Sequence, residues 1–206
     1  MKIELEAVSK RFRLEWVLRN VSLSFEPNRR YAVTGPNGSG KSTLLKIISG
    51  HLTPSKGQVS FAFQGRPLEV SAVYQHLSFA APYIELLEEL SLLEALRFHT
   101  RFKPLAPGLN TDALVELLGF ERARHKPVRN FSSGMKQRLK LALALCSNTP
   151  LLLLDEPTTT LDLEGIAWYR RLVEAYTPGR LIIIASNAEV DFDFCEERVS
   201  ILDWKQ

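Results

Sequence analysis

Residues 35–42 read Gly35-Pro36-Asn37-Gly38-Ser39-Gly40-Lys41-Ser42, which has the spacing G-x-x-x-x-G-K-[ST] of a phosphate-binding loop. A short apolar strand, residues 31–33, is predicted immediately before this loop. After Gly40 the apolar residues recur with helical period, which predicts a helix that ends at Gly50. A phosphate site requires this order of strand, glycine-rich loop and helix.

The chemistry of this loop suits the phosphates of a nucleotide. Its glycines allow backbone N–H groups to surround phosphate oxygens, and the positive end of the following helix favours anions. Lys41 is expected to reach the β- and γ-phosphates, and the Ser42 hydroxyl is expected to ligate Mg²⁺. The alternative, a glycine-rich turn with an exposed lysine, is disfavoured by the strand and helix on either side.

A second motif is a pair of carboxylates, Asp155 and Glu156, which follows the leucine run at residues 151–154. Such a run predicts a central parallel strand, and α/β sheets bind ligands at the carboxyl ends of their strands. Asp155 is expected to hold Mg²⁺ through water, and Glu156 to orient and polarise the attacking water. Asp-Glu-Pro is also a plausible helix-start turn, but the phosphate loop favours the catalytic interpretation. A GTPase is disfavoured because no NKxD guanine-recognition sequence occurs.

The remaining pattern predicts an α/β fold of the P-loop NTPase kind, with a mostly parallel central sheet, an N-terminal antiparallel β-subdomain and a small helical subdomain. Further strands are expected at residues 3–8, 17–25, 58–63, 71–74, 181–185 and 198–202. Further helices are expected at residues 86–101, at 111–118 with Thr111 or Asp112 as N-cap, from Ser132 or Ser133 onward, and at 163–176. We expect one domain over residues 1–206, with a core of about 1–80 and 150–206 and a helical subdomain of about 82–148.

The composition of the 206 residues is that of an ordinary globular chain, with 45% hydrophobic and 24% charged residues. The net charge of +3 is too small to imply a nucleic-acid surface. No stretch approaches the length of a membrane span, and the N-terminus lacks the apolar core of a signal peptide, so neither is expected. Cys146 and Cys195 lack CxxC or metal-site spacing, which favours buried free thiols in a reducing compartment.

Together these motifs resemble those of the ATP-binding cassette (ABC) ATPases, over a span from Ile3 to Asp203. In this resemblance the nucleotide site comprises residues 35–42 together with Thr43. The most specific part is the segment 131–138, Phe-Ser-Ser-Gly-Met-Lys-Gln-Arg, which is similar to the family's LSGGQ-QR signature. It departs from that signature at three positions, namely Phe131, Ser133 and Met135.

The resemblance implies that the signature segment acts in trans. Its residues are Ser132, Ser133, Gly134 and Met135. At a helix N-terminus, Ser132 and Gly134 suit binding of the γ-phosphate of a nucleotide held by the other subunit. A simple helix cap is the alternative for an isolated Ser-Ser-Gly, but its place shortly before the Asp155 strand favours the signature.

Three further roles are implied by the resemblance. Gln75, after the predicted strand 71–74, corresponds to the glutamine that contacts Mg²⁺ and the lytic water and links the site to the membrane partner, with Gln64 as its rival. Asp162 corresponds to an aspartate at the dimer interface and can also cap the following helix. Phe12 corresponds to the ring that stacks on adenine, with Trp16, or a core role for Phe12, as alternatives.

The family normally has a histidine that touches the γ-phosphate where this sequence has Asn187, after the predicted strand 181–185. An asparagine can still donate a hydrogen bond through its amide, but it cannot become a cation or move a proton. We therefore predict ATP binding with slow hydrolysis. The catalytic residues are then Glu156, Gln75 and Asn187.

The resemblance implies the ATPase subunit of an ABC transporter, which binds ATP and Mg²⁺ and pairs with a second copy of itself or with a homologous ATPase subunit. A separate integral membrane subunit is expected to dock near residues 75–101, so the chain is predicted to be cytoplasmic and peripheral on the inner face of the cell membrane. No nucleic-acid partner is expected. One alternative is an ATP-gated dimerisation switch with little turnover. A DNA-maintenance or translation-factor ABC protein is disfavoured, because the former need long coiled-coil insertions and the latter usually two cassettes.

Overall fold

The computed structural model describes residues 1–204; Lys205 and Gln206, which end the predicted domain 1–206, lie outside the described residues. The chain divides into two compact units. The first comprises residues 1–77, 150–156 and the chain from Gly179 onward, and the second comprises residues 78–149 and 157–178. Helix α5 (Leu163–Tyr176) thus belongs to the second unit, although the sequence places it in the core range. A single cassette domain stays a prediction.

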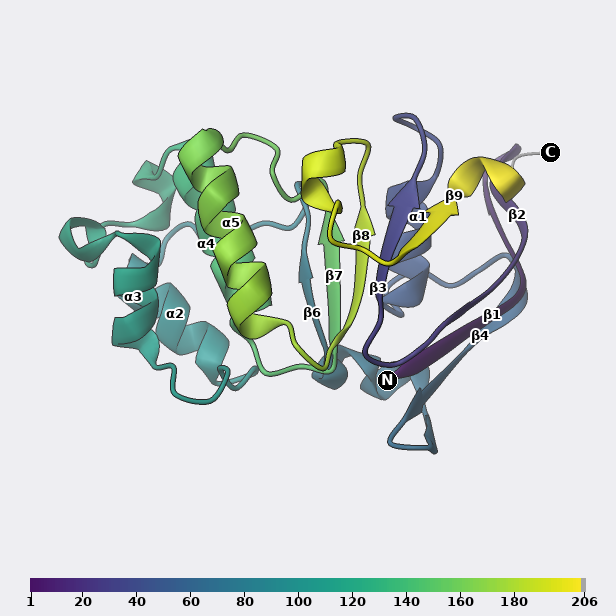
Figure 1. Ribbon diagram of the computed structural model, residues 1–206, viewed down its shortest axis with the longest axis horizontal. Helices are drawn as coiled ribbons and strands as arrows, with labels where there is room; N and C mark the ends of the chain where they lie inside the picture. Colours follow the sequence, from purple (N-terminus) through teal and green to yellow (C-terminus); the bar gives the residue numbers. More distant parts are fainter. Residues whose placement is uncertain (205–206) are drawn as a thin grey trace. The chain divides into compact units, whose positions relative to one another are not determined.

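An antiparallel sheet begins the first unit, with strand order β2-β1-β4-β5 (Figure 1). The strands are β1 (Lys2–Phe12), β2 (Glu15–Phe25), β4 (Lys56–Phe63) and β5 (Arg66–Leu68). Ile3 of β1 pairs with Phe25 on one side and Phe61 on the other, and all three side chains are buried. This hydrophobic row fixes the register, because a slip by one residue would turn it to the opposite face. The predicted N-terminal antiparallel region is confirmed.

A parallel sheet forms the centre of the first unit (Figure 1). The four strands of this sheet that lie wholly in the first unit follow the order β7 (Leu151–Asp155), β8 (Leu181–Ala185), β3 (Arg30–Thr34) and β9 (Glu197–Ser200). Every residue of β7 and β8 is buried, as their continuous apolar runs predict. Because the strands are parallel, the residues that follow β3, β7 and β8 meet at one edge of the sheet.

Helix α1 (Lys41–Ile48) follows β3 through the glycine-rich loop and contacts β7 and β8. Its buried apolar residues are Leu44, Leu45, Ile47 and Ile48, which are the residues that its helical period predicts. The strand, loop and helix therefore stand in the predicted order, and the predicted α/β fold class is confirmed.

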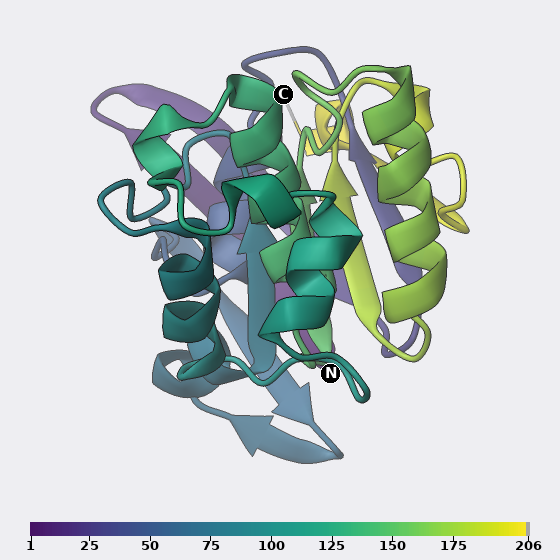
Figure 2. The ribbon, with the colours of Figure 1, turned by 90° about the vertical axis from the view of Figure 1, so that its left-hand side faces the viewer.

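The second unit contains α2 (Leu92–Thr100), α3 (Thr111–Leu118), α4 (Ser133–Leu145) and α5, drawn in teal to light green in Figure 2. Strand β6 (Leu77–Ala80) leads into it from the first unit. Helix α4 packs against α3 and α5. Each helix begins at a polar cap whose side chain accepts a backbone N–H three residues later; the caps are Ser91, Asn110, Ser132 and Asp162. The predicted caps Ser132 and Asp162 are confirmed, whereas Asn110 takes the place of Thr111 or Asp112.

The structure also bears on the membrane and cysteine predictions. Across residues 1–204, none of the helices combines the length and apolar character needed to cross a membrane. Both cysteines are free thiols; Cys146 is buried and Cys195 is partly buried. Burial, with the nearby Glu196 carboxylate, raises the pKa of the Cys195 thiol to about 12, so this thiol stays protonated and unreactive at neutral pH.

The strand predicted at residues 71–74 is wrong, because this segment belongs to a 3₁₀ helix, Val70–His76. Val73 is fully buried while Ser71 and Tyr74 are exposed, so one side chain in each turn faces inward and the alternation of a strand is absent. Gly50 permits this close packing, since a Cβ atom there would lie 3.2 Å from Val70 Cγ1. Tertiary packing therefore overrides the strand preference of the local sequence.

Two other elements differ in extent from their predictions. The helix expected at 86–101 begins only at Leu92, because Ser91 and Glu94 form a capping box that starts the helix there. The strand expected at 198–202 is β9, which ends at Ser200, and a 3₁₀ helix, Ile201–Trp204, follows it. Ile201 is fully buried, and its Cγ2 atom lies where a Cβ on Gly35 would clash at 2.5 Å. The chain therefore turns at Ile201 to pack on the phosphate loop.

Candidate nucleotide-binding site

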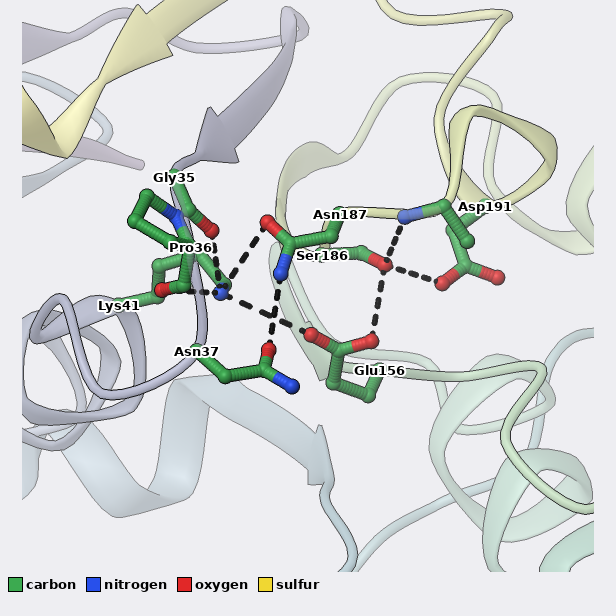
Figure 3. Close-up of polar contacts among 9 residues, drawn as sticks. Gly35, Pro36, Asn37, Lys41, Glu156, Ser186, Asn187 and Asp191 are labelled. Atoms are coloured by element: carbon green, nitrogen blue, oxygen red, sulfur yellow. Dashed lines mark hydrogen bonds and ion pairs between the residues drawn. The ribbon is translucent and has the colours of Figure 1, made fainter.

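Three loops of the first unit meet at the carboxyl edge of the parallel sheet (Figure 3). The loop after β3 contributes the phosphate loop, the chain after β7 contributes Glu156, and the chain after β8 contributes Ser186 and Asn187. Strands β7, β8 and β3 are neighbours in the sheet, so these side chains converge although their sequence positions are far apart. The sequence-predicted loop, Glu156 and Asn187 are thus brought together.

The phosphate loop has a backbone that only glycine adopts without strain. Gly40 has φ +106°, and a Cβ atom there would lie 3.0 Å from Val17 Cγ1 and 3.1 Å from Leu18 Cδ2. Inside the loop, the Ser39 hydroxyl is buried and has no hydrogen-bond partner among the described residues 1–204. A buried hydroxyl without a partner is costly, and a phosphate oxygen is an acceptor that would satisfy it. The loop therefore fits an anionic oxygen ligand.

Lys41 lies at the centre of this cluster and is only 5% exposed. Its Nζ donates to the carbonyl oxygens of Gly35 at 2.7 Å and Pro36 at 3.3 Å. It also lies 3.4 Å from Asn187 Oδ1 and 3.7 Å from Glu156 Oε1 (Figure 3). The ammonium group therefore faces the phosphate loop, the amide and the carboxylate together.

Glu156 is held in a specific orientation by its backbone and its carboxylate. Its N–H donates to the Ala185 carbonyl at 2.8 Å, and its φ of +47° lies in the left-handed region. The second carboxylate oxygen, Oε2, lies 3.1 Å from the Ser186 hydroxyl. That hydroxyl also lies 2.5 Å from Asp191 Oδ2, and it accepts the Ala188 N–H at 3.0 Å. One hydroxyl proton is therefore shared between two carboxylates, one of which belongs to the buried Asp191.

The Asn187 amide bridges the phosphate loop at two points. Its Nδ2 donates to Asn37 Oδ1 at 2.8 Å, and its Oδ1 faces the Lys41 ammonium. An amide offers a donor and an acceptor at the same time, so both contacts are satisfied without a change of protonation. Asn187 is thus positioned to contact whatever Lys41 binds.

The oxygen ligands expected for Mg²⁺ come from two neighbouring elements of the first unit. Ser42 is the second residue of α1, and Asp155 is the last residue of β7 and is 2% exposed. Hydroxyl and carboxylate oxygens are the donors that Mg²⁺ prefers, so this pair fits the ion. Among residues 1–204, no group of three or more His, Cys, Asp or Glu side chains could hold a metal ion. Phosphate oxygens of a nucleotide are further ligands of the kind that Mg²⁺ takes.

Gln75 does not follow a strand as the sequence predicts, whereas its rival Gln64 lies in a turn. Gln75 lies in the 3₁₀ helix that precedes β6, is exposed, and donates its amide to the Tyr74 hydroxyl at 3.1 Å. Gln64 forms the turn between β4 and β5 with φ +51° and is exposed. The structure joins neither side chain to the phosphate loop by a hydrogen bond within the described part of the chain. A catalytic or metal-binding role for Gln75 stays a prediction.

The candidate adenine-stacking rings lie close to the β1–β2 turn. Phe12 is 47% exposed, which excludes the alternative core role, and the Lys10 ammonium lies 5.3 Å from its ring centroid. Trp16 is half-buried, with the Arg11 guanidinium 5.4 Å and the Lys56 ammonium 5.5 Å from its ring. Both rings therefore present surfaces that already attract cations.

The signature residues and Asp162 meet within the second unit. A cavity of about 340 Å³ is lined by Ser132, Gly134, Met135, Arg138, Thr160, Leu161 and Asp162. Ser132 caps α4 by accepting the Met135 N–H at 3.2 Å, and Asp162 caps α5 by accepting the Gly165 N–H at 2.8 Å. Ser133 is exposed in the first turn of α4. Ser132 and Asp162 therefore cap their helices and also line the cavity at the N-terminal ends of α4 and α5.

Sequence reasoning assigned no role to three polar residues, namely Ser186 and Asp191 of the first unit and Gln137 of the second. All three are buried polar side chains that accept or donate a hydrogen bond. The signal available in the sequence was a polar residue at a position that the surrounding apolar pattern makes interior. For Asp191 this signal is weak, because the acidic residues near it in the sequence are exposed.

The profile of the family described as ABC transporter matches residues 18–159. The lantibiotic transport ATP-binding protein SrtF of Streptococcus pyogenes is 32% identical over 90% of this chain and 80% of its own length. The cytochrome c biogenesis ATP-binding export protein CcmA of Cupriavidus necator is 33% identical over 84% of this chain and 77% of its own length. A solved ATP-binding subunit of an ABC transporter, 26% identical, matches with a TM-score of 0.81 over 97% of this chain and 85% of its own. The chain therefore belongs to the ABC transporter family, as an ATP-binding ATPase subunit.

Proposed function

We propose that Lys41, Glu156 and Asn187 carry out ATP binding and hydrolysis in this subunit, with Mg²⁺ held by Ser42 and Asp155. The observation that carries this proposal is the position of Lys41 Nζ, 3.7 Å from Glu156 Oε1 and 3.4 Å from Asn187 Oδ1. A phosphate bound by Lys41 thus has a carboxylate and an amide beside it. This is the arrangement that phosphoryl transfer to water needs.

Lys41 exchanges neutral acceptors for charged ones when the nucleotide binds. The Gly35 and Pro36 carbonyls accept from its ammonium group in the free protein. Phosphate oxygens carry negative charge and form stronger, charge-assisted hydrogen bonds with an ammonium group. The backbone N–H groups of the loop and the Ser39 hydroxyl donate to the same phosphates.

Glu156 orients and polarises the attacking water. Its carboxylate is held from one side by Lys41 and from the other by the Ser186 hydroxyl, so an oxygen of fixed direction is available as the acceptor. Mg²⁺ supplies charge neutralisation of the phosphates when it is bound. Asn187 contributes a neutral donor to the γ-phosphate, and its inability to become a cation makes hydrolysis slow.

Two copies of the chain, or this chain and a homologous ATPase subunit, complete each other's sites. The supporting observation is the cavity at the N-terminal ends of α4 and α5, where Ser132 and Gly134 can receive the γ-phosphate of a partner's nucleotide. Asp162 lines the same cavity and lies at the proposed interface. Met135 gives this cavity an apolar wall where the family signature has a glutamine.

A separate integral membrane subunit docks near residues 75–101, and the chain is peripheral on the cytoplasmic face of the membrane. In the second unit, Tyr83, Leu87 and Phe98 are each 40% or more exposed, and they offer apolar surface to such a partner. The names of the similar proteins SrtF and CcmA refer to lantibiotic transport and to export in cytochrome c biogenesis. We therefore favour export as the direction of transport.

ATPase assays and ATP-binding assays on two variants test these roles. Lys41→Ala is expected to lose ATP binding, and Glu156→Gln is expected to keep ATP binding and lose hydrolysis. Exposed residues of the antiparallel and parallel sheets provide matched controls, Lys2→Ala and Glu197→Gln, which should retain both activities. A Lys41→Ala protein that binds ATP as the wild type does contradicts the proposed site.

A second candidate function is an ATP-gated dimerisation switch with little turnover. Asn187 and the altered signature residues Ser133 and Met135 favour it, whereas Glu156 beside Lys41 favours hydrolysis. Size measurements with and without ATP separate the two functions. Dimerisation on addition of ATP without phosphate release supports the switch. A measurable rate of ATP hydrolysis that Glu156→Gln abolishes supports the ATPase that powers transport.

A further inference from the structure

A buried glutamine of α4 is bonded to the chain next to the proposed catalytic carboxylate. Gln137 is 7% exposed, and its Nε2 donates to the Pro157 carbonyl oxygen at 2.7 Å. Pro157 is joined to Glu156 by a peptide bond. Helix α4 also carries the signature at its N-terminal end, where Ser132 is the cap. One helix therefore links the signature to the residue that follows Glu156.

Glu156 has a backbone conformation that needs support from both sides. Its φ of +47° is unfavourable for a residue with a side chain and persists only where the surroundings fix it. On the amino side, its N–H is held by the Ala185 carbonyl at 2.8 Å. On the carboxyl side stands Pro157, which has no N–H, so its carbonyl is its only backbone hydrogen-bonding group. Gln137 holds that carbonyl.

The bond to Pro157 explains why helix α4 buries an amide at position 137. The other residues that α4 buries are leucines and alanines, namely Leu139, Leu141, Ala142, Ala144 and Leu145. A methionine would fill the space of Gln137 without the cost of burying an amide. A buried donor is tolerated where it meets an acceptor, and the Pro157 carbonyl is that acceptor.

We propose that Gln137 is a positioning residue for Glu156: by holding the Pro157 carbonyl it anchors the residue that follows the strained Glu156 backbone, and this anchor aims the Glu156 carboxylate. The inference rests on the proposed role of Glu156 in hydrolysis.

The test is Gln137→Met, which keeps the side-chain length and removes the donor. In a crystal structure of this variant, the Pro157 carbonyl is expected to rotate and Glu156 to leave the left-handed region. The kcat for ATP hydrolysis is expected to fall about 10- to 100-fold, because a small misplacement of a catalytic group has effects of this size. The KM for ATP should stay within about twofold, since Gln137 does not touch the nucleotide.

Lys140→Met is the matched control on the same helix. The Lys140 ammonium also donates from α4 to a proline carbonyl, that of Pro82, at 3.1 Å. This variant loses a comparable bond far along the chain from Glu156, so its kcat should equal that of the wild type. Gln137→Glu, which keeps the shape but offers no amide donor, replaces Gln137→Met if the methionine variant does not fold.

Two outcomes overturn the positioning role. One is an unchanged Glu156 backbone and Pro157 carbonyl in the variant structure. The other is a fall in kcat that Lys140→Met reproduces, which would show a general effect of loosening α4. Absence of ATP hydrolysis by the wild-type chain contradicts the proposed function instead, and the backbone comparison then decides the role of Gln137 by itself.

Discussion

The side chains of Asn37 and Asn187 are joined by a hydrogen bond of 2.8 Å across 150 residues of sequence. This bond ties the phosphate loop after β3 to the chain after β8 and holds the Asn187 amide beside Lys41. The side chain at position 187 therefore reaches Lys41 because β8, which it follows, is the neighbour of β3 in the sheet. What it can do there depends on its protonation chemistry.

Asn187→His should raise ATP turnover. A histidine at this position can donate to the γ-phosphate as a cation, and hydrogen bonds to charged groups are roughly twice as strong as neutral ones. We expect a rise in kcat of about tenfold, which corresponds to about 1.4 kcal/mol in the barrier. Phosphate release under saturating ATP measures it, with Asn187→Ala as the comparison. No increase in a folded, ATP-binding Asn187→His protein would count against the role of Asn187.

Ser186→Ala should reduce both stability and turnover. The Ser186 hydroxyl lies between the Asp191 and Glu156 carboxylates, and its removal deletes one hydrogen bond to the buried Asp191 carboxylate and one to Glu156. The expected loss in the free energy of unfolding is about 1–3 kcal/mol. Urea titration measures this loss, and kcat should fall because the Glu156 carboxylate loses its hydrogen bond from Ser186. Ser186→Thr keeps the hydroxyl, so it should lose less stability and less kcat than Ser186→Ala. Equal losses in the two variants would exclude the hydroxyl as the cause.

Gly40→Ala should abolish ATP binding and destabilise the protein. An alanine is strained at a φ of +106°, and its Cβ would also lie about 3 Å from the side chains of Val17 and Leu18. Gly65→Ala provides the matched control, because Gly65 also has positive φ, at +76°, but a Cβ there meets no atom within 4 Å. Both variants should lose about 1 kcal/mol from backbone strain, and only Gly40→Ala should lose more. Thermal unfolding measures the stability of both variants, and the rise in Tm on addition of ATP shows whether each of them still binds ATP.

The stability of the protein should fall as the pH is lowered from 6.5 toward 4. Burial, with the nearby Lys103 ammonium, lowers the pKa of His99 from 6.5 to about 4, against an opposing hydrogen bond that the ring donates to the Leu143 backbone. The unfolded chain therefore takes up a proton near pH 6.5 that the folded chain does not accept until about pH 4. The resulting loss in the free energy of unfolding approaches about 3 kcal/mol at the acidic end.

Urea unfolding at several pH values checks this dependence. His99→Gln should flatten the stability profile between pH 6.5 and 4, because it removes the titrating group and keeps a polar side chain opposite Ser147. The exposed His125 supplies the control, His125→Gln, which should leave the slope unchanged. A wild-type slope that survives in His99→Gln would assign the dependence to other groups.

Local sequence pattern predicted most of the fold because most elements obey local rules. The apolar runs of β7 and β8 and the helical period of α5 depend on neighbouring residues alone, and α5 has the predicted bounds. The prediction of a strand within the segment Val70–His76 was wrong because the conformation of this segment depends on close packing against Gly50, which is distant in sequence. Helix α2 begins later than predicted because Ser91 caps it there, and apolar periodicity alone does not locate the first residue of a helix.

The sequence by itself determined the phosphate loop, since its glycines, Lys41 and Ser42 are contiguous and their chemistry is local. The sequence also predicted a role for Glu156 from the leucine run before it, and a role for Asn187 from the resemblance to the ABC ATPases. Only the tertiary structure decided that Asn187 bonds Asn37, that Ser186 and Asp191 support Glu156, and that Gln137 holds Pro157. These contacts follow from the strand order β7-β8-β3 and from helix packing, which bring together side chains that no local periodicity relates.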